Sequence, residues 1–254
     1  MTHPLLLAHL RRKQIAHTYL LSGPEEATKR TLALEFAKAL NCEQEKGFNE
    51  ACRCQSCGKI ERRTHPDVHW FGEDPESRSL KIEEIRTLLH EASLKPFEGR
   101  WKVFVLAGAE RLTLEAASAL LKTLEEPPEH SVFFLLVENK RHLLETIQSR
   151  AFEIRTPPVP EKDPRENSGV ELLHEKGWDA FFELLRNAPR PKLGEALEAL
   201  MFYLRDRGVS EGKRDLRRLE SYLKAIDSVY ETQEALQANT NQKLALTHLE
   251  IHLN

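Results

Sequence analysis

The sequence has 254 residues, of which 40% are hydrophobic, enough to bury one substantial core and a second, smaller one. Its 37 basic and 40 acidic residues give a formal net charge of −3, and this balance argues against strong DNA binding by the chain alone. The longest apolar run, residues 132–137, is too short to span a bilayer. The first residues lack the charged-then-apolar layout of a secretory signal. We therefore expect a cytoplasmic protein with no membrane partner.

The N-terminal part of the chain alternates strand-like runs with helical patterns. Residues 18–22 form an apolar run that ends at Gly23, after which apolar side chains recur with the period of a helix. Two further β-rich runs, residues 102–106 and 132–137, enclose a second helical pattern. Buried strands that alternate with helices are typical of a parallel sheet. The sequence therefore predicts an α/β domain over residues 1–157.

The chain changes character after this domain. Residues 156–168 are rich in proline and charge and have no apolar period, which predicts a linker at residues 158–168. Beyond it, apolar side chains such as Phe181 and Leu197 recur at helical spacing, and Asn241 is placed to cap a last helix. We predict an all-helical domain over residues 169–254.

Gly23 opens a segment that lies where a phosphate-binding loop would read G-x-x-x-x-G-K-[ST]. Thr28 stands in place of the second glycine, which lets the backbone fold tightly around phosphates. Arg30 replaces the hydroxyl residue that holds magnesium, and a guanidinium offers no metal ligand. Only Lys29 is left as a phosphate contact.

A second part of the expected phosphate chemistry is also missing. Ala107 and Gly108 follow the strand at residues 102–106, where acids would serve the magnesium ion and the attacking water. The loop by itself is typical of any strand, turn and helix that contains a glycine. The loss of both the loop residues and the acids, however, predicts a phosphate-loop fold without ATP binding or hydrolysis. The alternative is an active ATPase in which Lys29 and Thr31 restore the loop by a shift of one residue, and the missing acids disfavour it.

All the cysteines of the sequence lie within sixteen consecutive residues. They are Cys42, Cys52, Cys54 and Cys57. In a reducing cytosol such a cluster favours metal binding over disulfide pairing, and four thiolates suit a structural zinc ion in tetrahedral geometry. We predict a zinc module at about residues 42–57; four reduced cysteines without a metal are the alternative.

Taken together, these features resemble the delta-prime subunits of the bacterial DNA polymerase III clamp loader and, more distantly, the gamma/tau subunits. The resemblance is dense over residues 1–156. It runs through the cysteine cluster and through residues 17–24, 65–67, 80–86, 109–113 and 119–128. The last of these segments reads A-L-L-K-T-L-E-E-P-P and is among the most specific. A weaker resemblance covers the end of the chain.

The resemblance implies an AAA+ core, a small helical lid and a helical collar that holds the subunits in a ring. Delta-prime subunits bind no working nucleotide but supply an arginine to the ATP site of a neighbour. The matching residues here are Ser149, Arg150 and Ala151, so the resemblance implies that Arg150 is a trans-acting finger for the charge that develops in phosphoryl transfer. Asn139 matches the family's polar sensor and is expected to be structural.

The function that this resemblance implies is that of a non-catalytic component of the DNA-directed DNA polymerase III holoenzyme. The implied partners are the delta and gamma/tau subunits and, through the complex, the sliding clamp and primed DNA. Residues 169–254 correspond to the collar. Few residues separate Arg150 from the collar-like helices, so we expect the lid to be truncated or absent.

The cysteine spacing departs from the family pattern. The family usually separates its cysteines by eight, two and two residues, whereas this sequence has nine, one and two. Cys52 is thus displaced by one position, and His65 or His69 is an alternative fourth ligand. A rival function, an independent zinc-dependent nucleic-acid-binding protein, is disfavoured by the near-neutral charge and by the lack of a paired C-x-x-C and H-x-x-x-H layout.

Overall fold

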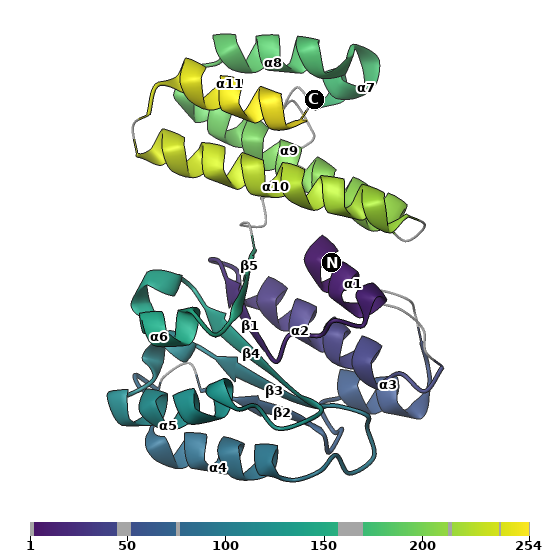
Figure 1. Ribbon diagram of the computed structural model, residues 1–254, viewed down its shortest axis with the longest axis vertical. Helices are drawn as coiled ribbons and strands as arrows, with labels where there is room; N and C mark the ends of the chain where they lie inside the picture. Colours follow the sequence, from purple (N-terminus) through teal and green to yellow (C-terminus); the bar gives the residue numbers. More distant parts are fainter. Residues whose placement is uncertain are drawn as a thin grey trace. The chain divides into compact units, whose positions relative to one another are not determined.

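The computed structural model describes residues 3–44, 52–74, 77–156, 170–212, 215–238 and 240–253. The chain divides into two compact units, one built on His9–Val159 and the other on Pro160–Asn254 with His3–Ala8 (Figure 1). Each unit has a hydrophobic core of its own. The linker expected at residues 158–168 lies outside the described residues, so the linker and the loss of a lid stay predictions.

The first unit is built on a parallel sheet, which confirms the predicted α/β domain. Its strands are β1 (Thr18–Ser22), β2 (Val68–Phe71), β3 (Lys102–Ala107), β4 (Ser131–Val137) and β5 (Phe152–Arg155). Their order across the sheet is β2-β3-β4-β1-β5, and every neighbouring pair is parallel. The carboxyl ends of all the strands therefore lie at one edge, where ligands of open parallel sheets usually bind.

Helices cover both faces of this sheet (Figure 1). The helical elements of this part of the chain are α1 (Pro4–Arg12), α2 (Glu26–Asn41), α3 (Gln55–Glu61), α4 (Ile82–Ser93), the short 3-10 helix η1 (Ala109–Arg111), α5 (Leu114–Glu125), the 3-10 helix η2 (Lys140–His142) and α6 (Glu145–Gln148). The Phe36 ring of α2 contacts Tyr19 and Phe134. Phe133, the neighbour of Phe134 in β4, belongs instead to the core that includes Leu120 of α5. Successive strand residues thus point to opposite faces and anchor different helices.

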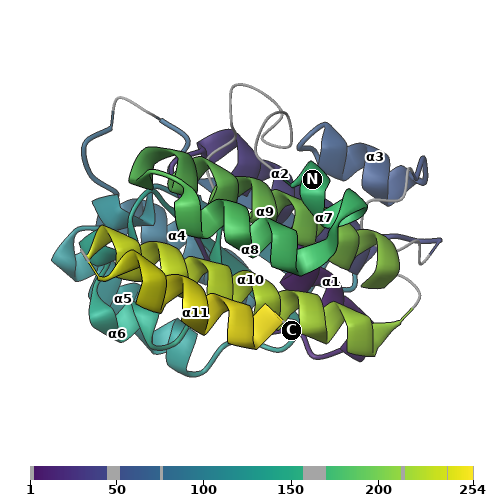
Figure 2. The ribbon, with the colours of Figure 1, turned by 90° about the horizontal axis from the view of Figure 1, so that it is seen from above.

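The second unit is helical throughout its described residues, as the sequence predicted. Its helices are α7 (Glu171–Glu175), α8 (Gly177–Asn187), α9 (Arg190–Gly212), α10 (Leu216–Gln237) and α11 (Gln242–Leu253). Figure 2 shows α8 to α11 running alongside one another. Phe181 and Leu197 are fully buried in the shared core. The side chain of Asn241 accepts a hydrogen bond from the backbone N–H of Lys243 at 2.9 Å, which confirms the predicted cap.

Among the described residues, none of the helices combines the length and the apolar character that a membrane crossing requires.

Candidate functional site

The loop after β1 is closed by the end of β5. Thr156 donates hydrogen bonds to the carbonyl oxygen of Ser22 from its backbone N–H at 2.7 Å and from its hydroxyl at 3.0 Å. A Cβ at Gly23, which has a φ of 150°, would collide with the carbonyl oxygen and the hydroxyl of Thr156. Glycine is therefore required here by the approach of the chain's own backbone, whatever the loop binds.

Lys29 turns inward from the first turns of α2. Its Nζ donates to the carbonyl oxygens of Gly23 at 2.5 Å and of Val137 at 2.7 Å, and the residue is only 3% exposed. Desolvation lowers the pKa of Lys29, although several surrounding glutamates act in the opposite direction. Lys29, the one residue that still matches a phosphate contact of the motif, thus joins the loop after β1 to the end of β4.

The other motif positions also have partners within the chain. Arg30 forms ion pairs with Glu26 at 2.6 Å and Glu73 at 2.8 Å, so it ties α2 to the segment after β2. Thr28 is buried in α2. The hydroxyl of Thr31 donates to the carbonyl oxygen of Ala27 within the helix.

A guanidinium lies beside the positions where the missing acids would stand. Ala107 is the last residue of β3, and Gly108 follows in a left-handed conformation with a φ of 64°. Arg111 Nη2 donates to the carbonyl oxygens of Gly72 at 2.7 Å and Ala107 at 3.2 Å, and Nη1 donates to that of Ser77 at 2.6 Å. A Cβ at Gly108 would collide with this guanidinium. Sequence reasoning did not single out Arg111.

Arg150 follows the short helix α6, and its side chain is 35% exposed. Its Nη2 donates to Glu125 Oε1 at 2.6 Å, and its Nη1 donates to the carbonyl oxygen of Thr146 at 2.9 Å. Gln148 Nε2 joins the end of α6 to η2 and the residue after it by donating to the carbonyl oxygens of Lys140 and Leu143. The guanidinium therefore lies at the surface on a segment that is hydrogen-bonded to its neighbours.

Asn139, the residue that matches the sensor position, caps a local element. Its Oδ1 accepts a hydrogen bond from the backbone N–H of Arg141 at 3.0 Å, at the start of η2. This contact satisfies a backbone donor that the short helix leaves unpaired.

The structure brings all four predicted cysteines together. One ligand atom from each of Cys42, Cys52, Cys54 and Cys57 lies within 4.8 Å of the others. Cys54 caps α3, and its Sγ accepts a hydrogen bond from the N–H of Cys57. Burial raises the pKa of Cys54, but backbone donors, led by the N–H of Cys57, lower it to about 7 overall. A thiolate is the form that binds metal.

The two histidines considered as alternative ligands lie in other contacts. His65 Nδ1 accepts a hydrogen bond from the N–H of Asp67 at 3.1 Å, so its Nε2 carries the proton and cannot ligate in this tautomer. His69 stacks on Phe104 with the ring centroids 5.1 Å apart. Within the described part of the chain, the group of side chains that lie close enough to hold a metal ion contains Cys52 and neither histidine.

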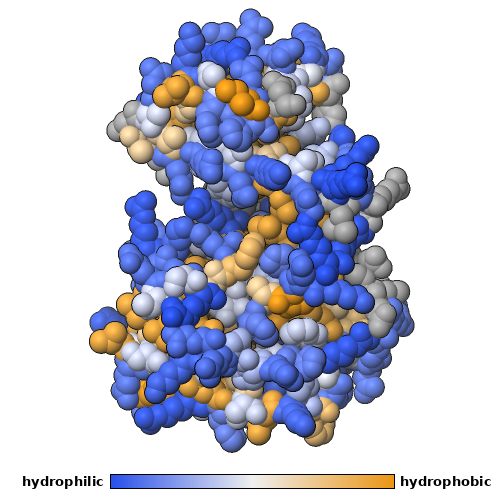
Figure 3. Space-filling model, in the orientation of Figure 1, coloured by the Kyte–Doolittle hydropathy of each residue, from blue (hydrophilic) through white to orange (hydrophobic). Residues whose placement is uncertain are grey.

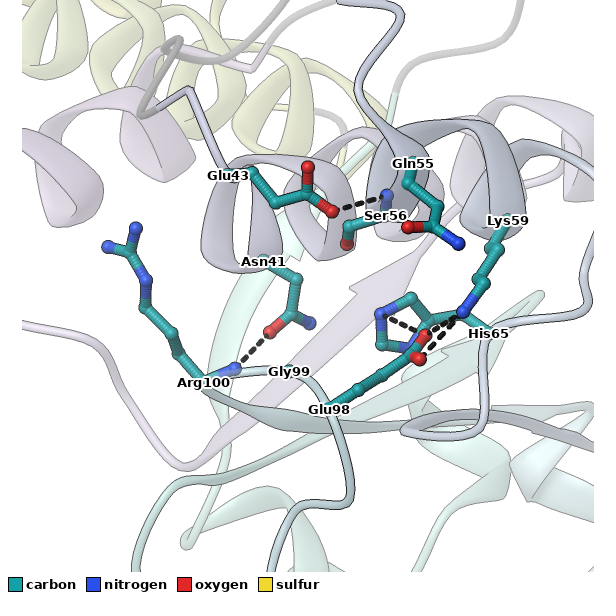
Figure 4. Close-up of a pocket in the computed structure, with 9 residues that line it drawn as sticks. All are labelled: Asn41, Glu43, Gln55, Ser56, Lys59, His65, Glu98, Gly99 and Arg100. Carbon is teal, nitrogen blue, oxygen red and sulfur yellow. Dashed lines mark hydrogen bonds and ion pairs between the residues drawn. The ribbon is translucent and has the colours of Figure 1, made fainter.

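A polar pocket of about 410 Å³ adjoins the cysteine module (Figure 4). It is lined by Asn41, Glu43, Gln55, Ser56, Lys59, His65, Glu98, Gly99 and Arg100. Glu98 accepts two hydrogen bonds from Lys59 at 2.6 and 2.8 Å, and His65 Nε2 lies 3.6 Å from it. The positive charge of Lys59 in this pocket is thus already paired with the carboxylate of Glu98. This ion pair also ties α3 to the segment before β3.

Two buried side chains organise that segment. Asp67 accepts hydrogen bonds from the backbone N–H groups of residues 97, 98 and 99, and Asn41 accepts from those of residues 100 and 101. Although burial acts in the opposite direction, these donors lower the pKa of Asp67. The sequence offered no signal for this brace, because its members are far apart in the chain.

The sequence profile of the family described as "DNA polymerase III, delta subunit" matches residues 2–160. The chain belongs to this family. A DNA polymerase III subunit delta' of Bacillus subtilis is 33% identical over 62% of this chain and 47% of its own length, and one of Pseudomonas aeruginosa is 34% identical over 75% and 53%. A DNA polymerase III subunit tau/gamma of Haemophilus influenzae is 35% identical over 60% of this chain and 22% of its own.

The chain thus spans about half the length of the delta' relatives that it matches. The family match covers the parallel-sheet unit, with the altered phosphate loop, the cysteine cluster and Arg150. Membership confirms the resemblance read from residues 1–156.

Proposed function

We propose that this protein is a clamp-loader subunit of the delta-prime kind, which supplies Arg150 to the ATP site of a neighbouring subunit and hydrolyses no ATP itself. The observation that carries the proposal is the contrast between two cationic side chains. Lys29 is buried against two carbonyl oxygens of its own chain, whereas the Arg150 side chain is 35% exposed on a braced helix end. The delta' and tau/gamma relatives support the coarser part of the proposal, a role as a clamp-loader subunit.

The absence of intrinsic ATPase activity is supported by the contacts at the expected nucleotide site. The P-loop lysine and the arginine after it are both engaged within the chain. Arg111 lies beside Ala107 and Gly108, where carboxylates would have to hold magnesium. A magnesium ion would meet a positive charge and no carboxylate at these positions.

The cysteine cluster supports a structural zinc ion. Four thiolates bound at about 2.3 Å around zinc lie about 3.8 Å from one another, and Cys42 Sγ and Cys52 Sγ are 3.6 Å apart. When bound, zinc would join the end of α2 to the start of α3, and the residues Cys42, Cys52, Cys54 and Cys57 would hold it. We infer a structural role because four protein ligands leave no open coordination position.

The proposed partners are the delta and gamma/tau subunits and, through them, the sliding clamp and primed DNA, in the cytoplasm. The helical unit carries a surface suited to such assembly. Leu244 and Ile251 of α11 are 66% and 70% exposed, and their spacing of seven residues places them on one face of the helix. Figure 3 shows hydrophobic residues at the surface over α11. We propose that this face belongs to the collar.

The test is ATP hydrolysis by a clamp loader reconstituted from its partner subunits and this chain or its Arg150→Ala form. We expect single-turnover hydrolysis at the dependent site to fall by about 10³-fold, while assembly, followed by gel filtration, is unchanged. Arg141→Ala, which removes another exposed guanidinium nearby, is the matched control and should have no effect. Unchanged hydrolysis in a fully assembled Arg150→Ala complex would remove Arg150 from the mechanism.

A further inference from the structure

Helix α5 ends in two acidic residues, Glu125 and Glu126. Carboxylates at this end of a helix face the negative end of the helix dipole and are disfavoured there. Glu125 has a compensating partner, because its Oε1 accepts a hydrogen bond from Arg150 Nη2 at 2.6 Å. Among the described residues no hydrogen bond or ion pair is recorded for the side chain of Glu126. The two neighbouring acids thus differ in one respect, the contact with Arg150.

Among the residues that the structure describes, Glu125 is the one partner of the Arg150 guanidinium on an element other than α6 and the turn after it. The other acceptors are the carbonyl oxygen of Thr146 at 2.9 Å and Ser149 Oγ at 3.3 Å, both from the immediately preceding residues. A guanidinium has five N–H donors, and these three contacts leave two of them. Glu125 therefore fixes the far end of the side chain without exhausting its capacity to bind a phosphate.

Buried packing sets the distance between the two residues. Leu124 of α5 and Ile147 of α6, which precede Glu125 and Arg150, lie in the same hydrophobic core, and Ala151 packs against it. The carboxylate on α5 and the guanidinium in the turn after α6 are consequently presented to each other by two segments that pack on the same core.

We propose that Glu125 is a positioning residue for Arg150. It holds the long side chain in one geometry, so that less conformational entropy is lost when the guanidinium meets the terminal phosphate of a nucleoside triphosphate on the neighbouring subunit. Glu125 itself touches no nucleotide. The inference rests on the proposed function of Arg150.

The experiment uses the reconstituted clamp loader with four forms of this chain: the unaltered chain, Glu125→Ala, Arg150→Ala and the double variant. We expect Glu125→Ala to lower the kcat of ATP hydrolysis about two- to fivefold, as for the loss of a partly exposed ion pair, with an unchanged KM for ATP. In the Arg150→Ala background, the same substitution should cause no further loss, because its only target is already gone. Glu126→Ala, which makes the same charge change one residue away, is the matched control and should leave kcat unchanged.

The outcomes separate this inference from the proposed function. A loss with Arg150→Ala but none with Glu125→Ala overturns the positioning role alone. A loss that is equally large in both backgrounds, or that Glu126→Ala reproduces, also overturns it, because it shows a structural or general charge effect. No loss with Arg150→Ala in an assembled complex overturns the finger first, and the positioning role with it.

Discussion

Asp67→Asn tests the brace that holds the segment before β3. The carboxylate is fully buried and accepts hydrogen bonds from the N–H groups of Phe97 at 2.7 Å, Glu98 at 2.8 Å and Gly99 at 2.7 Å. An asparagine oxygen can replace the atom that accepts two of these bonds, but the amide nitrogen cannot accept the third. Removing the charge and leaving one N–H donor unpaired should together lower the free energy of unfolding by about 3 kcal/mol.

The same contact gives the protein a defined pH dependence. The N–H donors hold the pKa of Asp67 below its ordinary value of 3.8. When the pKa of a carboxyl is lower in the folded than in the unfolded state, the carboxyl contributes stability. This contribution is fully present above the pKa of the unfolded state and is lost as the pH falls through the pKa of the folded state. The difference in stability between the unaltered protein and Asp67→Asn should therefore be constant near neutral pH and shrink below about pH 4.

The assay is urea unfolding followed by tryptophan fluorescence, in a Trp178→Phe background. That substitution removes the tryptophan of the helical unit and leaves Trp70 and Trp101, which report on the sheet unit. We expect the midpoint to fall by about 1 M urea. The control, Glu129→Gln, makes the same charge change at an exposed position and should shift the midpoint little. An equal shift in both variants, or a difference that persists undiminished at pH 2, would refute the reasoning.

Three further outcomes are expected. Cys52→Ser should lower the zinc affinity at least about tenfold, measured by competition with a chromogenic chelator, whereas His65→Ala should leave the affinity unchanged. The reverse result would make His65 the fourth ligand. Lys29→Met should remove the Nζ donor from the Gly23 and Val137 carbonyl oxygens, of which Val137 keeps the N–H of Gly23, and cost about 1–3 kcal/mol in urea unfolding. The ATPase rate of the assembled complex should stay unchanged, and a fall in that rate would contradict the proposed inactivity of this site. Leu120→Ala should cost about 2–5 kcal/mol because its side chain is fully buried in the core between α5 and the sheet, and a smaller cost would show that the core collapses around the cavity.

The central strands and the helical unit could be predicted from the sequence because their signals are local. Residues 132–137 are a continuous apolar run, as a strand buried on both faces requires. The two edge strands were not predicted. β2 (Val68–Phe71) and β5 (Phe152–Arg155) have only four residues each and are partly exposed, so they lack the apolar run that marks a buried strand.

The residues of the candidate site also differ in whether the sequence could predict them. Thr28, Lys29 and Arg30 could be compared with a motif because that motif is contiguous in sequence. The roles of Glu125 and Asn41 could not be predicted, because their partners lie 25 and 59 residues away. Polar contacts of this kind leave no periodicity in the sequence, and only the folded chain brings their members together.

The proposed loss of the nucleotide site rests on contacts that a reversal of its motif residues would not undo. Exchanging Thr28 and Arg30 for the usual glycine and hydroxyl residues would leave Lys29 bound to the Val137 carbonyl. An acid in place of Gly108 would need a left-handed backbone, with a φ of 64°, and would displace Arg111 from the carbonyl oxygens that it joins. In this unit buried or internally paired cations stand where a phosphate-loop enzyme would bind phosphate and magnesium. The contacts that we propose to have replaced nucleotide binding now join the carboxyl ends of β1, β3 and β4 to their surroundings, so regaining activity would require rebuilding the edge of the sheet that they stabilise.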